Sequence, residues 1–165
     1  MSKCNSQDKK RFDRLYCIPI KQEFIEMNDQ IVGIWGSKAL RDDQVTDIGR
    51  QLLGKKYLGT YPIDKIPLSK SDKYMIINVD RAGLPGSHWC GLYIKGATIY
   101  IYDSFARQTK RLLKPLYDKA KKVNKTIIDV NSKSDQKNNT EICGPLSLSF
   151  LYIIHKHGVQ AGRYI

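Results

Sequence analysis

Hydrophobic positions recur at helical spacing in the segment that follows residue 41. Asp42 or Asp43 can cap this segment and Gly54 can end it, in keeping with the usual preference for acidic residues at the start of a helix and glycine at its end. The apolar positions that share one face are Val45, Ile48, Leu52 and Leu53. The pattern therefore predicts a helix from about residue 42 to residue 53.

Runs of apolar and β-branched residues then replace the helical spacing and predict four strands. The predicted strands are residues 74–79, 88–94, 98–102 and 126–130. Only Lys95-Gly96-Ala97 separates the second strand from the third, so these two should form a hairpin. Turn-forming residues predict loops at 57–62 and 81–87, and a polar stretch predicts a long loop at 131–141.

Two further helices complete the pattern. Residues 107–124 carry leucines on one side and lysines elsewhere, which predicts an amphipathic helix with Pro115 as a candidate interruption. Residues 143 to about 157 are apolar nearly all round, so this helix should be buried. The order of helix, three strands, helix, strand and helix predicts the α+β fold class.

Residues 1–40 lack this regular patterning, and we expect an N-terminal extension or arm ahead of one domain at 41–165. The extension contains the basic run Lys9-Lys10-Arg11 and a short apolar patch around Trp35. One interpretation is that Trp35 packs on the main body. The alternative is that the arm contacts a partner or a substrate.

Composition narrows the class of protein. The chain has 165 residues, of which 41% are hydrophobic and 27% charged, which is typical of one globular domain and excludes a collagen-like or largely disordered chain. No apolar run reaches the ~18 residues of a membrane span, and the first residues are polar, so we expect neither membrane association nor secretion. The 28 basic residues against 16 acidic ones give a net charge of +12, which favours an anionic partner.

The cysteines do not predict a disulfide framework or a metal site. The four cysteines are Cys4, Cys17, Cys90 and Cys143. Without an export signal they are expected to stay reduced. None of them forms a C-x-x-C pair, and His155 and His157 are wrongly spaced to ligate zinc from one helix face.

Three residues have the chemistry of a cysteine nucleophile with an oriented base. Cys143 begins the last predicted helix, where the helix dipole stabilises a thiolate. His88 begins one strand of the predicted hairpin and Asp103 follows the other, so both side chains should lie at the same end of adjacent strands. The alternative for Cys143 is a small apolar residue at the start of a core helix, and the alternative for His88 is a structural histidine at a strand edge.

A fourth residue fits the same chemistry. Gln136 lies seven residues before Cys143 in the predicted polar loop. Its amide can donate to a developing oxyanion alongside the backbone N–H of Cys143. Taken by itself, Gln136 is one polar loop residue among many.

In the order His, Asp, Gln, Cys, the chain resembles the adenain family of viral cysteine endopeptidases and, more distantly, the ubiquitin-like-protein proteases that share their fold. The matching segments are Tyr57-Leu58-Gly59-Thr60-Tyr61, Ile76-Ile77-Asn78, Gly86-Ser87-His88-Trp89, Tyr102-Asp103-Ser104-Phe105, and Gln136 with Cys143-Gly144. The resemblance covers about residues 42–157. The spacing from Gln136 to Cys143 is similar to that of adenain-type enzymes. The aspartate at position 103, within Tyr102-Asp103-Ser104, is instead similar to the ubiquitin-like-protein proteases, whereas adenain-type enzymes carry glutamate at this position.

The resemblance implies a mixed β-sheet around a buried central helix that carries the nucleophile at its N-terminus. It implies Cys143 as the nucleophile, His88 as the base and Asp103 as the residue that orients the base. The implied oxyanion donors are Gln136 and the backbone of Cys143, and Trp89 is expected to shape the cleft.

The implied activity is cleavage of peptide bonds in viral capsid or precursor proteins, inside the virion or the host cell. No cofactor is expected for the chemistry itself. Members of the family are activated by viral DNA and by a peptide linked through a cysteine; Lys125 stands at that position, so an activator peptide should not be disulfide-linked. The alternatives are a protease specific for SUMO or another ubiquitin-like protein, and a basic nucleic-acid-binding module with a vestigial site.

Basic residues are concentrated between positions 107 and 125, with eight of them against a single acidic residue, Asp118. The eight are Arg107, Lys110, Arg111, Lys114, Lys119, Lys121, Lys122 and Lys125. On an amphipathic helix the lysines should face away from Leu112 and Leu116 and form one surface for nonspecific binding of DNA or another polyanion. The alternative is an ordinary solvated lysine face.

Overall fold

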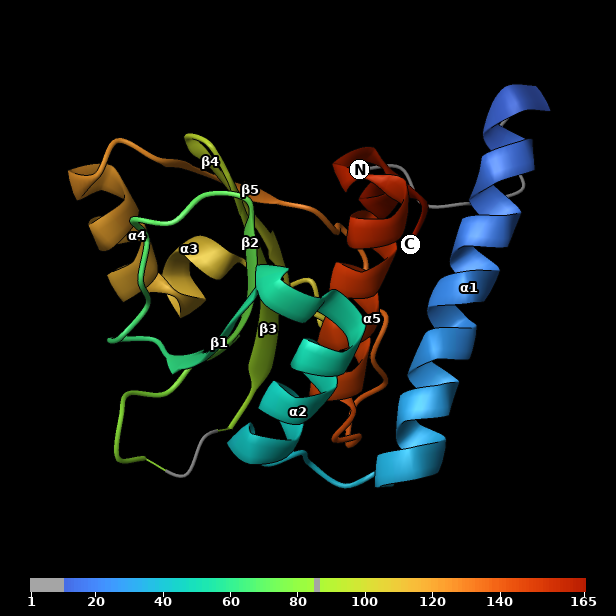
Figure 1. Ribbon diagram of the computed structural model, residues 1–165, viewed down its shortest axis with the longest axis horizontal. Helices are drawn as coiled ribbons and strands as arrows, with labels where there is room; N and C mark the ends of the chain where they lie inside the picture. Colours follow the sequence, from blue (N-terminus) through green and yellow to red (C-terminus); the bar gives the residue numbers. More distant parts are fainter. Residues whose placement is uncertain (1–10, 85–86) are drawn as a thin grey trace.

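Helices cover both faces of a five-stranded sheet in the computed structural model, which describes residues 11–84 and 87–165. In Figure 1 the sheet is seen nearly edge-on, with α1, α2 and α5 on one side and α3 and α4 on the other. The helices are α1 (Arg11–Trp35), α2 (Asp42–Leu53), α3 (Thr109–Leu112), α4 (Lys114–Lys122) and α5 (Cys143–His157), with the 3₁₀ turns η1 (Gly54–Lys56) and η2 (Val159–Tyr164). The strands are β1 (Tyr57–Pro62), β2 (Lys73–Asn78), β3 (Trp89–Lys95), β4 (Thr98–Tyr102) and β5 (Thr126–Asp129). This arrangement confirms the predicted α+β class.

The sheet is mixed, and its strands follow one another in chain order from β1 to β5. The outer pairs β1–β2 and β4–β5 are parallel, whereas β2–β3 and β3–β4 are antiparallel. The predicted hairpin is confirmed as β3 and β4, with Lys95 paired to Thr98 next to the turn. Neighbouring residues such as Ile76 and Ile77 are both fully buried, because each face of the sheet is covered.

The central helix α5 is buried as predicted, with every residue from the first position, Cys143, to Leu151 inaccessible or nearly so. Its close approach to the sheet depends on Gly91 in β3, where a Cβ would lie 3.2 Å from the carbonyl oxygen of Ser147. The predicted position of Cys143 at the N-terminus of a buried helix is thus confirmed. No helix in the described ranges is long and apolar enough to cross a membrane.

Residues 11–35 form the long helix α1, which the sequence pattern did not predict. Ile20, Phe24 and Ile31 are buried in the same apolar cluster as α5, and α1 lies beside α5 along much of its length (Figure 1). Trp35 is half-buried against this cluster, in agreement with the first interpretation of the apolar patch. Cys4, Lys9 and Lys10 lie outside the described residues.

Two local predictions are wrong. Residues 57–62 form the edge strand β1 instead of a loop: Gly59 sits at a register irregularity with φ 152°, and Pro62 ends an edge strand where no N–H is needed. The single helix predicted at 107–124 is two helices, α3 and α4, which meet at Leu113 with φ −115° and ψ 37°. Pro115 lies in the first turn of α4, where a missing N–H costs nothing.

Candidate active site

Four elements converge on one cleft of about 600 Å³. The ends of the parallel strands β1 and β2, the start of β3 and the first residue of α5 meet there. The lining residues are 39–42, 60–62, 78, 80–84, 87–89 and 143. Cys143 and His88 therefore share one solvent-accessible cavity, as a nucleophile and its base must.

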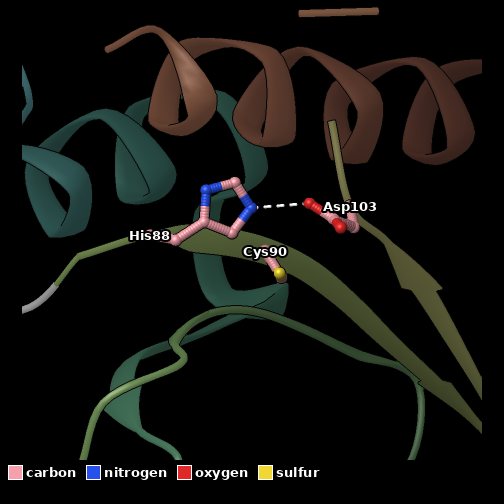
Figure 2. A group of neighbouring side chains, drawn as sticks. All are labelled: His88, Cys90 and Asp103. Carbon is pink, nitrogen blue, oxygen red and sulfur yellow. Dashed lines mark hydrogen bonds and ion pairs between the residues drawn. The ribbon is translucent and has the colours of Figure 1, made fainter. Parts of the chain in front are cut away.

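His88 and Asp103 form a buried hydrogen-bonded pair. The hairpin places them at the same end of β3 and β4, and the His88 Nε2–H donates to Asp103 Oδ1 over 2.6 Å. His88 is 6% exposed and Asp103 1%. Figure 2 shows Nε2 pointing at the carboxylate, while the second ring nitrogen faces away from it. The carboxylate thus fixes the orientation of the imidazole and leaves Nδ1 available for proton transfer.

Further donors fix the Asp103 carboxylate. Arg107 donates to Oδ2 twice, from Nε over 3.0 Å and from its backbone N–H over 3.1 Å, and the Phe105 N–H lies 3.3 Å from Oδ1. Burial raises the pKa of Asp103, but the hydrogen bonds and the positive charges of His88 and Arg107 outweigh it and lower the pKa. Asp103 is therefore ionised at neutral pH.

The Cys143 thiol is activated by its surroundings. Burial opposes ionisation, but hydrogen bonding to His88 and to the backbone of Trp89 and Gly144 lowers the pKa of Cys143 below its usual value. Burial likewise opposes protonation of His88, yet its hydrogen bonds to Asp103 and Cys143 raise the His88 pKa to about 11. The two shifts together favour a thiolate–imidazolium pair.

Cys90 is a third neighbour of the pair and was not singled out from the sequence. One donor atom each from His88, Cys90 and Asp103 lies within 4.8 Å of the other two (Figure 2), a separation that a zinc ion would also accept. Burial raises the pKa of the Cys90 thiol, so this thiol is less readily ionised than that of Cys143. Cys90 is fully buried beside the pair, and hydrogen bonding to it contributes to the raised pKa of His88.

Trp89 lines the cleft, in the position expected for a residue that shapes it. Its indole N–H donates to the Leu40 carbonyl oxygen over 3.0 Å. A Cβ at Gly144 would lie 3.3 Å from the indole ring and 3.2 Å from Leu40. The wall next to Cys143 is therefore closely packed, and a side chain at position 144 would require Leu40 or Trp89 to shift.

Gln136 is buried beside the site but is not among the described residues that line the cleft. Its Oε1 accepts from the Ser104 hydroxyl over 2.6 Å, and its Nε2 donates to the Thr140 carbonyl over 2.7 Å. One Nε2 hydrogen remains for another acceptor. The role of Gln136 as an oxyanion donor stays a prediction.

The predicted basic surface is smaller than the sequence suggests. Arg107 is paired with Asp103, Lys119 donates to the Ile66 carbonyl, and Lys125 donates to the Gly96 carbonyl over 2.5 Å. Lys114 forms an ion pair with Asp118 over 2.7 Å. The remaining members, Lys110, Arg111, Lys121 and Lys122, are exposed on α3 and α4.

Three contacts of the site were missed from the sequence: Arg107 to Asp103, the Phe105 ring on the His88 ring at 5.4 Å, and Asn131, whose Nδ2 donates to the Asp103 carbonyl over 2.5 Å. Only the first had a signal, because an acidic residue precedes Arg107 by four positions. The chain matches no family model and no curated protein sequence. The functional assignment therefore depends on the geometry of the site.

Proposed function

We propose that this chain is a cysteine endopeptidase in which Cys143 is the nucleophile, His88 the base and Asp103 the residue that orients the base. The observation that carries the proposal is the buried His88–Asp103 pair next to a thiol of lowered pKa at a helix N-terminus, with His88 and Cys143 both lining one cleft. Taken singly, Cys143 could be a small apolar residue of a core helix and His88 a structural histidine. An oriented acid–base pair beside an activated thiol is the arrangement that acyl transfer requires.

The reaction follows from these positions. The Cys143 thiolate attacks the carbonyl carbon of the scissile peptide bond, and the C=O electron pair moves to oxygen. When the tetrahedral adduct collapses, the C–N bond breaks and the departing amine takes the proton from His88 Nδ1, leaving a thioester. Water then attacks the thioester and gives its proton to His88, and cleavage of the C–S bond restores the thiolate–imidazolium pair.

The backbone N–H of Cys143 and the remaining Nε2 hydrogen of Gln136 are the proposed oxyanion donors. An adenain-like fold is part of the same proposal, supported by the hairpin that carries His88 and Asp103 and by the buried helix that begins at Cys143. The proposed substrates are viral capsid or precursor proteins, cleaved during virion maturation in the virion or the host cell. The chemistry itself uses protein groups alone.

A protease for SUMO or another ubiquitin-like protein is the second candidate function. The observation that favours it is an aspartate, Asp103, as the orienting carboxylate within Tyr102-Asp103-Ser104. The substrate distinguishes the two: a ubiquitin-like partner with a Gly-Gly terminus, or unrelated precursor sequences. A nucleic-acid-binding module with a vestigial site is disfavoured, because binding of nucleic acid does not require a buried imidazole that is oriented by a hydrogen-bonded carboxylate.

Replacement of Cys143 tests the proposal. Wild type and Cys143→Ala are each co-expressed with candidate viral structural proteins and with ubiquitin-like precursors, and the cut sites are mapped by mass spectrometry. We expect cleavage by wild type and none by Cys143→Ala, whereas Cys90→Ala keeps most of the activity because its thiol is buried and protonated. Cleavage by Cys143→Ala at the wild-type rate would overturn the assignment of the nucleophile.

A further inference from the structure

Asn78 lines the cleft at the point where three strands meet. It is the last residue of β2, where it is paired with Pro62 of β1 on one side and with Trp89 of β3 on the other. Directly opposed residues of an antiparallel pair project to the same face of a sheet, so the Asn78 side chain lies on the face of Trp89. It is 8% exposed and lines the cleft that holds Cys143.

The orientation of the Asn78 amide is fixed by its own turn. Oδ1 accepts the N–H of Asp80 over 2.9 Å, which assigns the donor group Nδ2 to the other branch of the amide. Nδ2 donates to no residue that the structure describes, and it is not one of the fully buried polar atoms that lack a partner. Since it has neither a partner nor complete burial, Nδ2 is a donor held in place and open to the cavity.

The backbone donors around Asn78 are already used or missing. The Val79 N–H donates to the His88 carbonyl over 3.1 Å, and the Ile63 N–H donates to the Asp80 carbonyl over 3.1 Å. Pro62 has no N–H to offer. A peptide that enters the cleft brings carbonyl oxygens that lose their water, and each needs a donor in exchange.

We propose that Asn78 is a substrate-binding residue whose Nδ2 donates a hydrogen bond to a backbone carbonyl oxygen of the peptide in the cleft. The inference rests on the proposed peptidase function and adds a residue to which the catalytic assignment gives no role. A backbone carbonyl is the acceptor because it is present at every position of a peptide, whatever its side chains. Such a contact is made by the bound substrate as well as by the transition state, so it acts mainly on binding.

The experiment uses Asn78→Asp, which keeps the size of the side chain and the oxygen that accepts from Asp80, but removes the donor. Asn78→Ala removes the donor without adding charge, and Asn138→Asp makes the matched change on the exposed 131–141 loop. The probes are acetyl-Leu-Gly-Gly with a C-terminal vinyl methyl ester and, as a reagent without a peptide backbone, iodoacetamide. Mass spectrometry follows modification of Cys143, and thermal unfolding verifies that each variant folds.

We expect both Asn78 variants to react with the peptide probe at least about tenfold more slowly, because a higher probe concentration is needed for half-maximal rate. Their rate with iodoacetamide should stay within about twofold of wild type. Asn138→Asp should match wild type with both probes. Unchanged peptide reactivity of the Asn78 variants, or slowing in Asn78→Asp alone, would overturn the donor role and leave the peptidase assignment standing. If wild-type Cys143 reacts with the peptide probe no faster than an unstructured cysteine peptide does, the peptidase function fails, and the Asn78 role with it.

Discussion

Arg107 belongs to the site as much as to the basic surface in which the sequence places it. Its side chain is 42% exposed, yet Nε is bonded to the buried Asp103 carboxylate and the guanidinium lies 5.3 Å from the centre of the Phe105 ring. The Phe105 ring in turn stacks on His88 at 5.4 Å. Arg107 therefore contacts two neighbours of the His88 imidazole: the Asp103 carboxylate, which accepts from Nε2, and the Phe105 ring, which stacks on the imidazole face.

Arg107→Met should lower kcat/KM roughly tenfold, because it removes one charge-assisted hydrogen bond that orients Asp103. It should also move the alkaline limb of the pH–activity profile to higher pH, since one positive charge near the imidazolium is gone and the Asp103 carboxylate then faces the charge of His88 without a competing guanidinium. A purely structural role would lower the rate at every pH and leave the limb in place. Arg111→Met, a matched change on the exposed face of α3, should alter neither.

The His88–Asp103 pair should make stability depend on pH in a definite direction. The raised pKa of His88 means that its contribution to the free energy of unfolding is complete below about pH 6.5, the unfolded value, and is lost as pH rises toward 11. The lowered pKa of Asp103 adds stability above its unfolded value near 3.8, which is lost on further acidification. The window of greatest benefit therefore lies between about pH 4 and pH 6.5.

Urea unfolding of wild type and Asp103→Asn across the pH range tests this. We expect Asp103→Asn to be less stable by about 2 kcal/mol at pH 5–6, the worth of a hydrogen bond between charged groups, and by less at pH 9–10. A difference that grows toward alkaline pH would contradict the direction of the His88 shift.

The sequence predicted the parts of the site that hydrogen-bonding register fixes. A three-residue turn and two strands of known length are enough to place His88 beside Asp103, and the Gly144-Pro145 start of an apolar helix is enough to place Cys143. The sequence could not predict how the side-chain amides of Gln136 and Asn78 are oriented. Their orientation is set by local hydrogen bonds, Gln136 to Thr140 and Asp80 to Asn78, which the spacing of residues does not specify.

The errors in the predicted strands and helices have a common physical origin in tertiary packing. The sequence of β1 contains Gly59 and Pro62, which are typical of turns, but pairing with β2 makes it a strand. Helix α1 contains Pro19 and Gly33 and has a weak apolar stripe, yet Phe24 and Ile31 are buried against the cluster around α5. Local propensity alone could not reveal either element, because each is stabilised by pairing or packing with another element.

Two helical glycines separate propensity from packing. Gly33 in α1 has nothing within 4 Å of an added Cβ, whereas a Cβ at Gly49 in α2 would lie 2.4 Å from the buried ring of Tyr57 in β1. We expect Gly33→Ala to stabilise the protein by up to about 1 kcal/mol through helix propensity. Gly49→Ala should destabilise it by about 1–3 kcal/mol, because the ring is held by its hydroxyl bond to Thr60 and cannot retreat. Equal stabilisation by both would show that α2 does not pack on β1 this closely.

The sheet separates the cleft from the basic surface. The apolar cluster that includes Cys143 lies with α1, α2 and α5, and the cluster that includes Leu113 and Leu116 lies with α3 and α4 on the other face (Figure 1). The exposed cations Lys110, Arg111, Lys121 and Lys122 therefore project from the side opposite Cys143. A long polyanion bound there leaves the cleft open to substrate.

We predict that the chain, with its net charge of +12, binds DNA without sequence preference through these cations, and that affinity falls steeply with salt because bound phosphates release counterions. Changing Lys121 and Lys122 to glutamate should reduce the log–log salt slope by about 1.8, at about 0.9 for each phosphate that the variant no longer neutralises. Glutamate at Lys38 and Lys55, which are exposed elsewhere, changes the net charge equally and should affect the slope far less. Cleavage of a short free peptide should be unchanged by the Lys121 and Lys122 substitutions, since neither residue lies near the cleft. Fluorescence titrations at several salt concentrations measure the slopes; equal slopes for the two double variants would mean that the α4 lysines are an ordinary solvated face.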